Sequence, residues 1–175
     1  DVRGMGHFEA RRGFLLDTEG NAQDEMLVVR LDEDKRGDRR FYVAGTAQAR
    51  ERLKNYIRMA ADGYTFGDPD DVHLKIEGPA LVCDLAEIHP PVAVLRLVGR
   101  GVGGALTAVS AELKDLESGY GRRVVVDGLP VTVVRADWTD DICECFVFAP
   151  FRVAERIWRG VCEKGLRPAG WSAYT

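Results

Sequence analysis

The chain has 175 residues, of which 46% are hydrophobic and 30% charged, and its formal net charge is −4. This length suits one large domain or two small ones, and the composition is that of a soluble globular protein. The acidic balance disfavours a general nucleic-acid binder, which needs a basic face. The longest apolar run, Val92–Val98, is interrupted by Arg96 and is far shorter than the roughly 18 residues that indicate a membrane span. We therefore expect neither nucleic acid nor a membrane as a partner.

The cysteines do not predict a disulfide scaffold, because there are four in a chain of this length. Reduced thiols in a cytoplasmic protein are the simpler interpretation. Cys143 and Cys145 would lie on one face of a strand. Zinc requires about four ligands, however, and no second Cys/His pair has suitable spacing. We interpret these two cysteines as small buried residues. The other two are Cys83 and Cys162.

The first half of the chain predicts a hairpin, a further strand and a helix. Two apolar strands flank a polar turn between Phe8 and Leu31, and a very polar link leads to a strand at Arg40–Ala44. Thr46 is typical of a helix N-cap, and Gly63 offers a C-terminal stop. The buried face expected for this helix consists of Leu53, Tyr56, Ile57 and Ala60. A further strand is expected after it, at Val72–Ile76.

The second half predicts a strand at Val92–Val98, a glycine-rich turn at Gly99–Gly104 and a helix at Ala105–Leu116. Asp127-Gly128 is a strong two-residue hairpin turn. Frequent hairpins with single helices between them favour an α+β fold, a mainly antiparallel sheet with single helices packed on one side. The remaining expected elements are strands at Arg122–Asp127, Pro130–Arg135 and Cys143–Phe148, and a helix from Phe151 to Gly165 that buries Ala154, Ile157, Trp158 and Val161.

An acidic pair, Asp24 and Glu25, stands where the second strand of the first hairpin begins. Adjacent side chains on a strand point to opposite faces, so one of the two can face a ligand at the strand mouth. A carboxylate within hydrogen-bond reach of an amine can orient it and take its proton, which typically contributes about 10²–10⁴-fold to a rate. Asp24 is a candidate for that role, and Glu25, which would point to the opposite face, is given a structural role. The alternative for Asp24 is a solvated residue at a strand start.

Three stretches, in one order, carry a resemblance to a known family. Gly20–Val28 reads Gly-Asn-Ala-Gln-Asp-Glu-Met-Leu-Val where the family has Gly-Gly-x-x-Asp-Asp-Leu-Ile-Val, and Val92–Gly99 is similar to its apolar strand ending in Gln-Gly-Pro. Arg135–Gly170 begins Arg-Ala-Asp-Trp-Thr-Asp-Asp where the family has Arg-Thr-Gly-Tyr-Thr-Gly-Glu. It continues into a segment similar to the family's helix of the type Leu-Trp-x-x-Leu-x-x-x-Gly-x-x-Pro-x-Gly. In this order and spacing the chain resembles the glycine-cleavage T-protein family, the folate-dependent aminomethyltransferases. The matching helix residues are Ile157, Trp158, Gly165, Pro168 and Gly170.

The resemblance implies that residues 1–175 form a partial folate-binding domain of the aminomethyltransferase type. It implies tetrahydrofolate as the cofactor, and transfer of a one-carbon or methyl group to it from a small-molecule amine or methyl donor. Asp24 matches the family's aspartate beside the pterin nitrogens and is the expected catalytic residue. Trp138 and Asp141 fall in its Tyr-Thr-Gly-Glu loop, and Arg12 falls at its first-strand tyrosine. These three are the expected cofactor-binding residues.

The resemblance covers the middle portion of the family's domain. Asp1-Val2 looks like the end of its Asn-Asp-Val segment, which indicates a fragment or a processed chain. A domain without its first part would expose a sheet edge or an apolar face. We expect a partner chain or a homodimer to cover it.

Two alternatives to a folate-dependent transferase remain. The first is a non-catalytic folate-binding or assembly subunit, since the family's strand-end asparagine falls at Gly45 and its second glutamate at Cys145. The second is an NAD(P)-binding domain, because Gly99–Gly104 satisfies G-x-G-x-x-G after a strand. Asp127 follows about twenty residues on, as that fingerprint requires. The fingerprint normally also needs further parallel strands.

Overall fold

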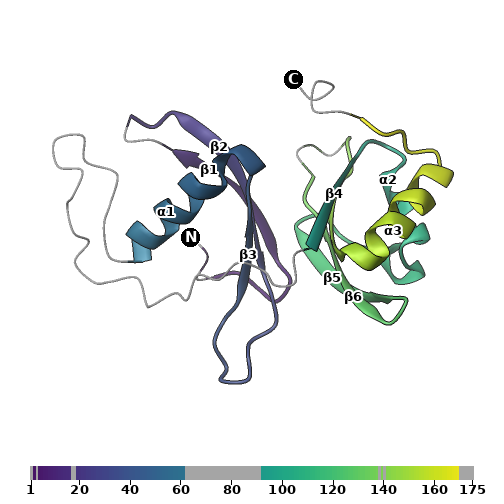
Figure 1. The fold of residues 1–175 in the computed structure, drawn as a ribbon, viewed down its shortest axis with the longest axis horizontal. Coiled ribbons are helices and arrows are strands. Elements are labelled where there is room, and N and C mark those ends of the chain that lie inside the picture. The colour runs from purple at the N-terminus through teal and green to yellow at the C-terminus, as the bar shows by residue number, and fades with distance from the viewer. Residues whose placement is uncertain are drawn as a thin grey trace. The chain divides into compact units, whose positions relative to one another are not determined.

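The protein is α+β with antiparallel sheets, as the sequence predicts (Figure 1). The computed structural model describes residues 2, 4–16, 19–61, 92–137, 139 and 141–169. The chain divides into two compact units. Unit 1 comprises Asp1–Ala10, Val29–Arg40 and Ile88–Thr175, and unit 2 comprises Arg11–Val28 and Phe41–Glu87.

A three-stranded sheet in the order β1-β2-β3 contains the predicted first hairpin. β1 spans Ala10–Leu16 and β2 spans Ala22–Arg30, within the hairpin expected from Phe8 to Leu31. β3 spans Phe41–Ala44, one residue shorter than predicted. The polar link before β3 closes a tight tip, in which the Asp34 carboxylate accepts the backbone N–H of Arg36 and of Asp38. Local turn chemistry therefore connects β2 to β3.

The helix predicted after β3 is present. A 3-10 turn at Ala47–Ala49 leads into α1, Arg50–Ala61, and Leu53 is buried as expected. Thr46 occupies the N-cap position with extended backbone, but its hydroxyl does not cap the helix. Gly63 and the strand expected at Val72–Ile76 lie outside the described residues, as does the side chain of Ala60.

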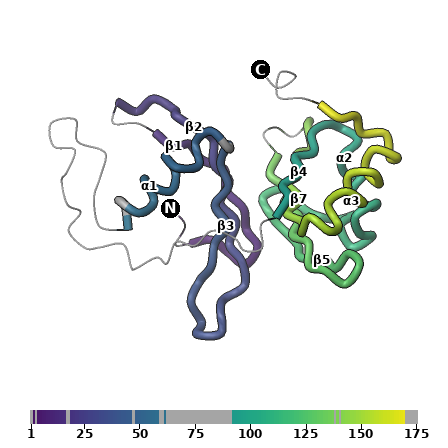
Figure 2. The backbone as a smooth tube through the Cα atoms, viewed as in Figure 1, coloured from purple at the N-terminus to yellow at the C-terminus, as the bar shows by residue number. Residues whose placement is uncertain are grey.

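A four-stranded antiparallel sheet has the order β4-β7-β6-β5. The backbone paths of β4 and β7 can be followed in Figure 2. Its strands lie close to the predicted ranges, because apolar runs and turn residues mark them clearly. Asp127 and Gly128 both have positive φ, 51° and 75°, which is the conformation of a two-residue type I′ hairpin turn. The strands are β4 (Val92–Val98), β5 (Tyr120–Val126), β6 (Leu129–Arg135) and β7 (Glu144–Pro150).

The prediction of a single helix at Ala105–Leu116 is wrong. The segment forms separate short turns, which are α2 (Val102–Ala105) and 3-10 turns at Leu106–Ala108 and Ala111–Leu113. Ser110 breaks the helix, since its backbone is extended and its side chain accepts the N–H of Glu112. Serine favours such local bonds over a helix interior. The larger apolar residues of the segment, Leu106, Val109, Leu113 and Leu116, are nevertheless buried.

α3 spans Phe151–Glu163 and covers one face of the four-stranded sheet, where it packs on β4 and β7. Ala154, Ile157 and Val161 are buried as predicted, but Trp158 is 40% exposed and is not a core residue. Among the described residues, no helix combines the length and apolar character needed to cross a membrane. The core beneath α3 includes Leu97, Leu106, Leu113, Val131, Val133, Cys145, Val147, Val153 and Ile157.

This placement of α3 predicts different costs for two neighbouring substitutions. Ile157→Ala should lower the free energy of unfolding by about 2–5 kcal/mol, because it removes a fully buried side chain. Trp158→Ala should cost clearly less, although it removes more atoms, because Trp158 already contacts solvent. Urea unfolding followed by circular dichroism measures both. An equal or larger loss for Trp158→Ala would contradict the helix orientation.

In unit 1, one aspartate joins three segments that are distant in sequence. The Oδ1 atom of Asp32 lies 2.5 Å from Nε2 of His7, and its Oδ2 atom lies 3.1 Å from a guanidinium nitrogen of Arg123 on β5. The hydrogen bond with His7 holds the pKa of Asp32 below its ordinary value, and the charge of Arg123 acts in the same direction. The contact is largely solvent-accessible, so solvent screens it.

The lowered pKa of Asp32 gives a signed pH prediction. A group with a depressed folded-state pKa contributes stability above its unfolded pKa and loses it as the pH falls through the folded value. Stability should therefore decline as the pH falls below 3.8, the ordinary pKa of Asp32, and Asp32→Asn should flatten this decline. Denaturant midpoints across the acid range test it. Asp38→Asn, in the same exposed segment but outside the contact with His7, is the control that should leave the slope unchanged.

Candidate functional site

Asp24, the predicted catalytic residue, is fixed by two hydrogen bonds from one neighbour. In unit 2, its Oδ2 atom accepts the backbone N–H of Thr46 and its Oδ1 atom accepts the Thr46 hydroxyl, each at 3.0 Å. Asp24 is half-buried near the start of β2, and Thr46 immediately precedes the first turn of the helical segment. The hydroxyl that sequence reasoning assigned to helix capping is used to orient this carboxylate.

Gly45 leaves the space that this arrangement needs. A Cβ atom at this position would lie 2.8 Å from Oδ2 of Asp24 and 3.1 Å from a side-chain carbon of Leu53. The first distance is shorter than real Cβ contacts, so a larger residue would displace the carboxylate or the backbone. The family resemblance had marked Gly45 as a departure from an asparagine. Here the glycine permits Asp24 to approach the end of β3 closely.

The carboxylate of Asp24 can still accept hydrogen bonds from a ligand. Each oxygen of an ionised carboxylate has two lone pairs, and Thr46 uses one on each. Both donors are uncharged, and within the described part of the chain Asp24 forms no ion pair. A half-buried, oriented carboxylate of this kind can accept an amine N–H, take its proton or stabilise a cation beside it.

Arg12, a predicted cofactor contact, is engaged elsewhere in unit 2. Its guanidinium lies 2.7 Å from Oε1 of Glu25, and the two side chains are 10% and 25% exposed. Glu25 follows Asp24 on β2, so its side chain points to the opposite face. This supports the structural role predicted for Glu25. The structure does not bring Arg12 and Asp24 together on one face of the sheet.

The other two predicted contacts belong to unit 1. Asp141 is exposed, in a turn that is closed by a bridge between Thr139 and Ile142. Trp138 lies outside the described residues. Of the four predicted site residues, Asp24 and Arg12 are therefore the two that are partly buried and held by hydrogen bonds from or to neighbouring side chains.

A buried ion pair in unit 1 was missed by sequence reasoning. Glu144 on β7 is 1% exposed and pairs with Arg96 on β4, whose guanidinium also lies 5.3 Å from the ring centroid of Phe146. The signal was available, because each is the one charged residue in an apolar strand. Asp137 braces the same strand, since its Oδ1 atom accepts the backbone N–H of Glu144 at 2.7 Å and its Oδ2 atom accepts Nε of Arg135 at 2.8 Å.

Cys145, at the position of the family's second glutamate, faces the apolar core beneath α3. Burial raises the pKa of the Cys145 thiol. It also raises the pKa of the Cys143 thiol, which is less deeply buried. Both are free thiols. Cys145 therefore offers no polar contact to a ligand on the opposite face of the sheet.

The glycine-rich turn lacks the setting of a dinucleotide site. β4, which precedes Gly99–Gly104, pairs antiparallel with β7, and β5 lies at the opposite edge of the sheet. The dinucleotide fingerprint needs a parallel β-α-β unit, and the described sheet contains no parallel pair. α2, which would receive the phosphates, has four residues.

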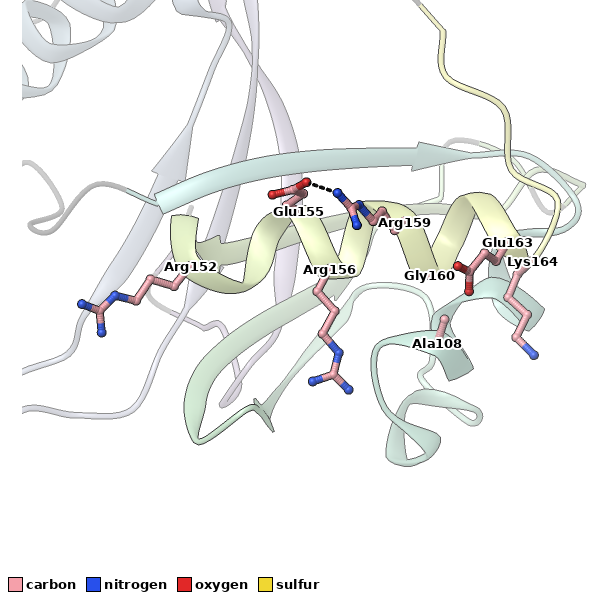
Figure 3. Close-up of a pocket in the computed structure, with 8 residues that line it drawn as sticks. All are labelled: Ala108, Arg152, Glu155, Arg156, Arg159, Gly160, Glu163 and Lys164. Atoms are coloured by element: carbon pink, nitrogen blue, oxygen red, sulfur yellow. Dashed lines mark hydrogen bonds and ion pairs between the residues drawn. The ribbon is translucent and has the colours of Figure 1, made fainter.

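An open groove of about 600 Å³ follows the outer face of α3 (Figure 3). Its side chains are mostly charged, and Arg159 pairs with Glu155 across one helical turn at 2.5 Å. None of the predicted site residues lines it. The lining residues are Ala108, Arg152, Glu155, Arg156, Arg159, Gly160, Glu163 and Lys164. Among the described residues, no group of three His, Cys, Asp or Glu side chains is placed to hold a metal ion.

Comparison with known proteins adds no family to this description. A scan against protein-family models finds no model that matches the chain. A search of curated proteins finds no match either.

The close approach at Gly45 gives a prediction for the Asp24 site. Gly45→Ala should lower the free energy of unfolding by about 1–3 kcal/mol, as overpacking does, because the new methyl group meets Oδ2 of Asp24. Gly13→Ala on β1 is the matched control, since its Cβ would make an ordinary 3.7 Å contact with Met26. Denaturant unfolding compares them. Equal stabilities of the two variants would show that Asp24 is not held against Gly45.

Proposed function

We propose that the chain is a tetrahydrofolate-dependent one-carbon transferase of the aminomethyltransferase type, acting on a small amine or a methylated substrate. The observation that carries the proposal is the Asp24 carboxylate, which is oriented by Thr46 and has no cationic partner among the described residues. The ordered resemblance at Gly20–Val28, Val92–Gly99 and Arg135–Gly170 supplies the identity of the ligand.

The residues around Asp24 fit an amine-bearing ligand. Acceptor lone pairs remain on both carboxylate oxygens after the bonds from Thr46 are counted. The negative charge is half-buried, so less of its interaction with a nearby positive charge is lost to solvent. When bound, tetrahydrofolate supplies the amine nitrogens that accept the one-carbon group. Asp24 holds the N–H of such an amine and removes its proton, and Thr46 keeps the carboxylate in position.

A ligand titration tests this proposal. Tetrahydrofolate should raise the melting temperature of the wild-type chain and change its tryptophan fluorescence, whereas NADH and NADPH should do neither. Asp24→Asn should weaken tetrahydrofolate binding, because an uncharged amide replaces the carboxylate. Once a donor is identified, the same variant should slow turnover by about 10²–10⁴-fold, the usual contribution of a general base.

Two variants serve as controls for Asp24→Asn. Glu25→Gln removes the neighbouring carboxylate on the opposite face and should leave the fluorescence response intact. Thr46→Val removes one of the two donors to Asp24 but keeps its charge, so it should give an intermediate loss. Circular dichroism verifies that each variant is folded. A wild-type chain that does not respond to tetrahydrofolate, or an Asp24→Asn variant that binds it equally well, would refute the assignment.

A second candidate is a non-catalytic folate-binding or assembly subunit on the same scaffold. The observation that favours it is the engagement of Arg12 by Glu25, which keeps one expected contact away from Asp24. Such a subunit would bind tetrahydrofolate without depending on the charge of Asp24. The titration therefore separates the two candidates, since the second predicts equal affinity for the wild type and Asp24→Asn.

A further inference from the structure

The groove along α3 combines small residues with a charged rim (Figure 3). Gly160 of α3 lies so close to Ala108 that a Cβ atom on the glycine would be 3.3 Å from the Cβ atom of the alanine. Neither residue places a long side chain in the groove, so an extended main chain can lie against them. The groove runs from Arg152 to Lys164, which corresponds to about 18 Å of helix. About six residues of extended chain span that length.

The rim of the groove is basic, although the chain as a whole is acidic. Four basic and two acidic side chains line the groove, whereas the whole chain has a formal net charge of −4. One of the two carboxylates, that of Glu155, is paired with Arg159. Arg156 pairs with Asp127 of the β5–β6 turn. The central charges of the rim are therefore largely compensated within the protein.

The two cations at the ends of the groove are not compensated in this way. Neither Arg152 nor Lys164 forms an ion pair within the part of the chain that the structure describes, and both are exposed. The remaining carboxylate of the rim, Glu163, is also exposed. A guanidinium binds a carboxylate through two parallel N–H donors, and an ammonium group offers three donors. The ends of the groove thus fit carboxylates that a partner supplies.

We propose that the α3 groove is a docking site for an extended acidic segment of a partner protein. The main chain of that segment lies against Gly160 and Ala108, and its carboxylates accept hydrogen bonds from Arg152 and Lys164. Exposed charge contacts are individually weak and are screened by salt, so this association is reversible and depends on ionic strength. The site is independent of the function proposed for Asp24.

A fluorescence-polarisation titration of the whole chain tests the groove. The probe is a labelled hexapeptide of alternating glutamate and glycine, and a peptide with glutamine in place of glutamate provides the uncharged comparison. The wild type should bind the glutamate peptide at low ionic strength, lose affinity as salt is added, and not bind the glutamine peptide. Arg152→Glu/Lys164→Glu should lower the affinity about tenfold or more, because two attractions become repulsions.

Lys35→Glu/Arg36→Glu is the matched control, since it makes the same change of net charge at exposed residues of the β2–β3 link, outside the groove. This variant should keep the wild-type affinity, and circular dichroism verifies that both double variants fold. A wild type that does not bind the glutamate peptide would overturn the proposal, and so would equal losses in the two double variants. A single-stranded oligonucleotide that binds more tightly than the peptide, and is lost in Arg152→Glu/Lys164→Glu, would also overturn it by assigning the groove to nucleic acid.

Discussion

The fold of unit 1 depends on the alternation of side chains along β7. Cys145 and Val147 point into the core beneath α3, whereas Glu144 and Phe146 point to the other face, where Arg96 of β4 holds the carboxylate. A shift of one residue in the pairing of β7 would exchange the two faces and bring Glu144 into the apolar core. The ion pair and the hydrophobic core therefore specify the same register. An unpaired carboxylate in the core would cost several kcal/mol, of order 3–5.

Much of this fold could be predicted, because turns and apolar runs are local signals. Asp127-Gly128 predicted a hairpin, and both residues have the positive φ that such a turn requires. The prediction of a helix at Ala105–Leu116 failed because the apolar spacing of this segment also suits separate turns. Ser110 favours the turns, since its side chain accepts a backbone N–H. The prediction that Trp158 is a core residue failed for a different reason. It lies at the margin of the apolar stripe of α3, and helical periodicity does not define how far the neighbouring sheet extends over that margin.

The site was less predictable, since its contacts join distant segments. Asp24 could be singled out at a strand start, but its partner Thr46 is 22 positions away and has the sequence signature of an N-cap. Glu144 and Arg96 each stood alone in an apolar strand, which indicates a buried pair. Their meeting requires β4 to lie beside β7, however, and this neighbour relation follows from strand order rather than from any local pattern.

Glu144, which is buried, and Asp24, which is half-buried, illustrate how partners decide what a charge can do. Glu144 is neutralised by a guanidinium, so its contribution is to register and stability. Asp24 is held by a backbone N–H and a hydroxyl, which orient the carboxylate without cancelling its charge. A carboxylate that is both positioned and uncompensated can stabilise positive charge that develops beside it. Gly45 makes this possible by allowing the donors of Thr46 to approach. The local geometry around Asp24 thus links the ordering of the β3–α1 connection to the availability of a carboxylate for a ligand.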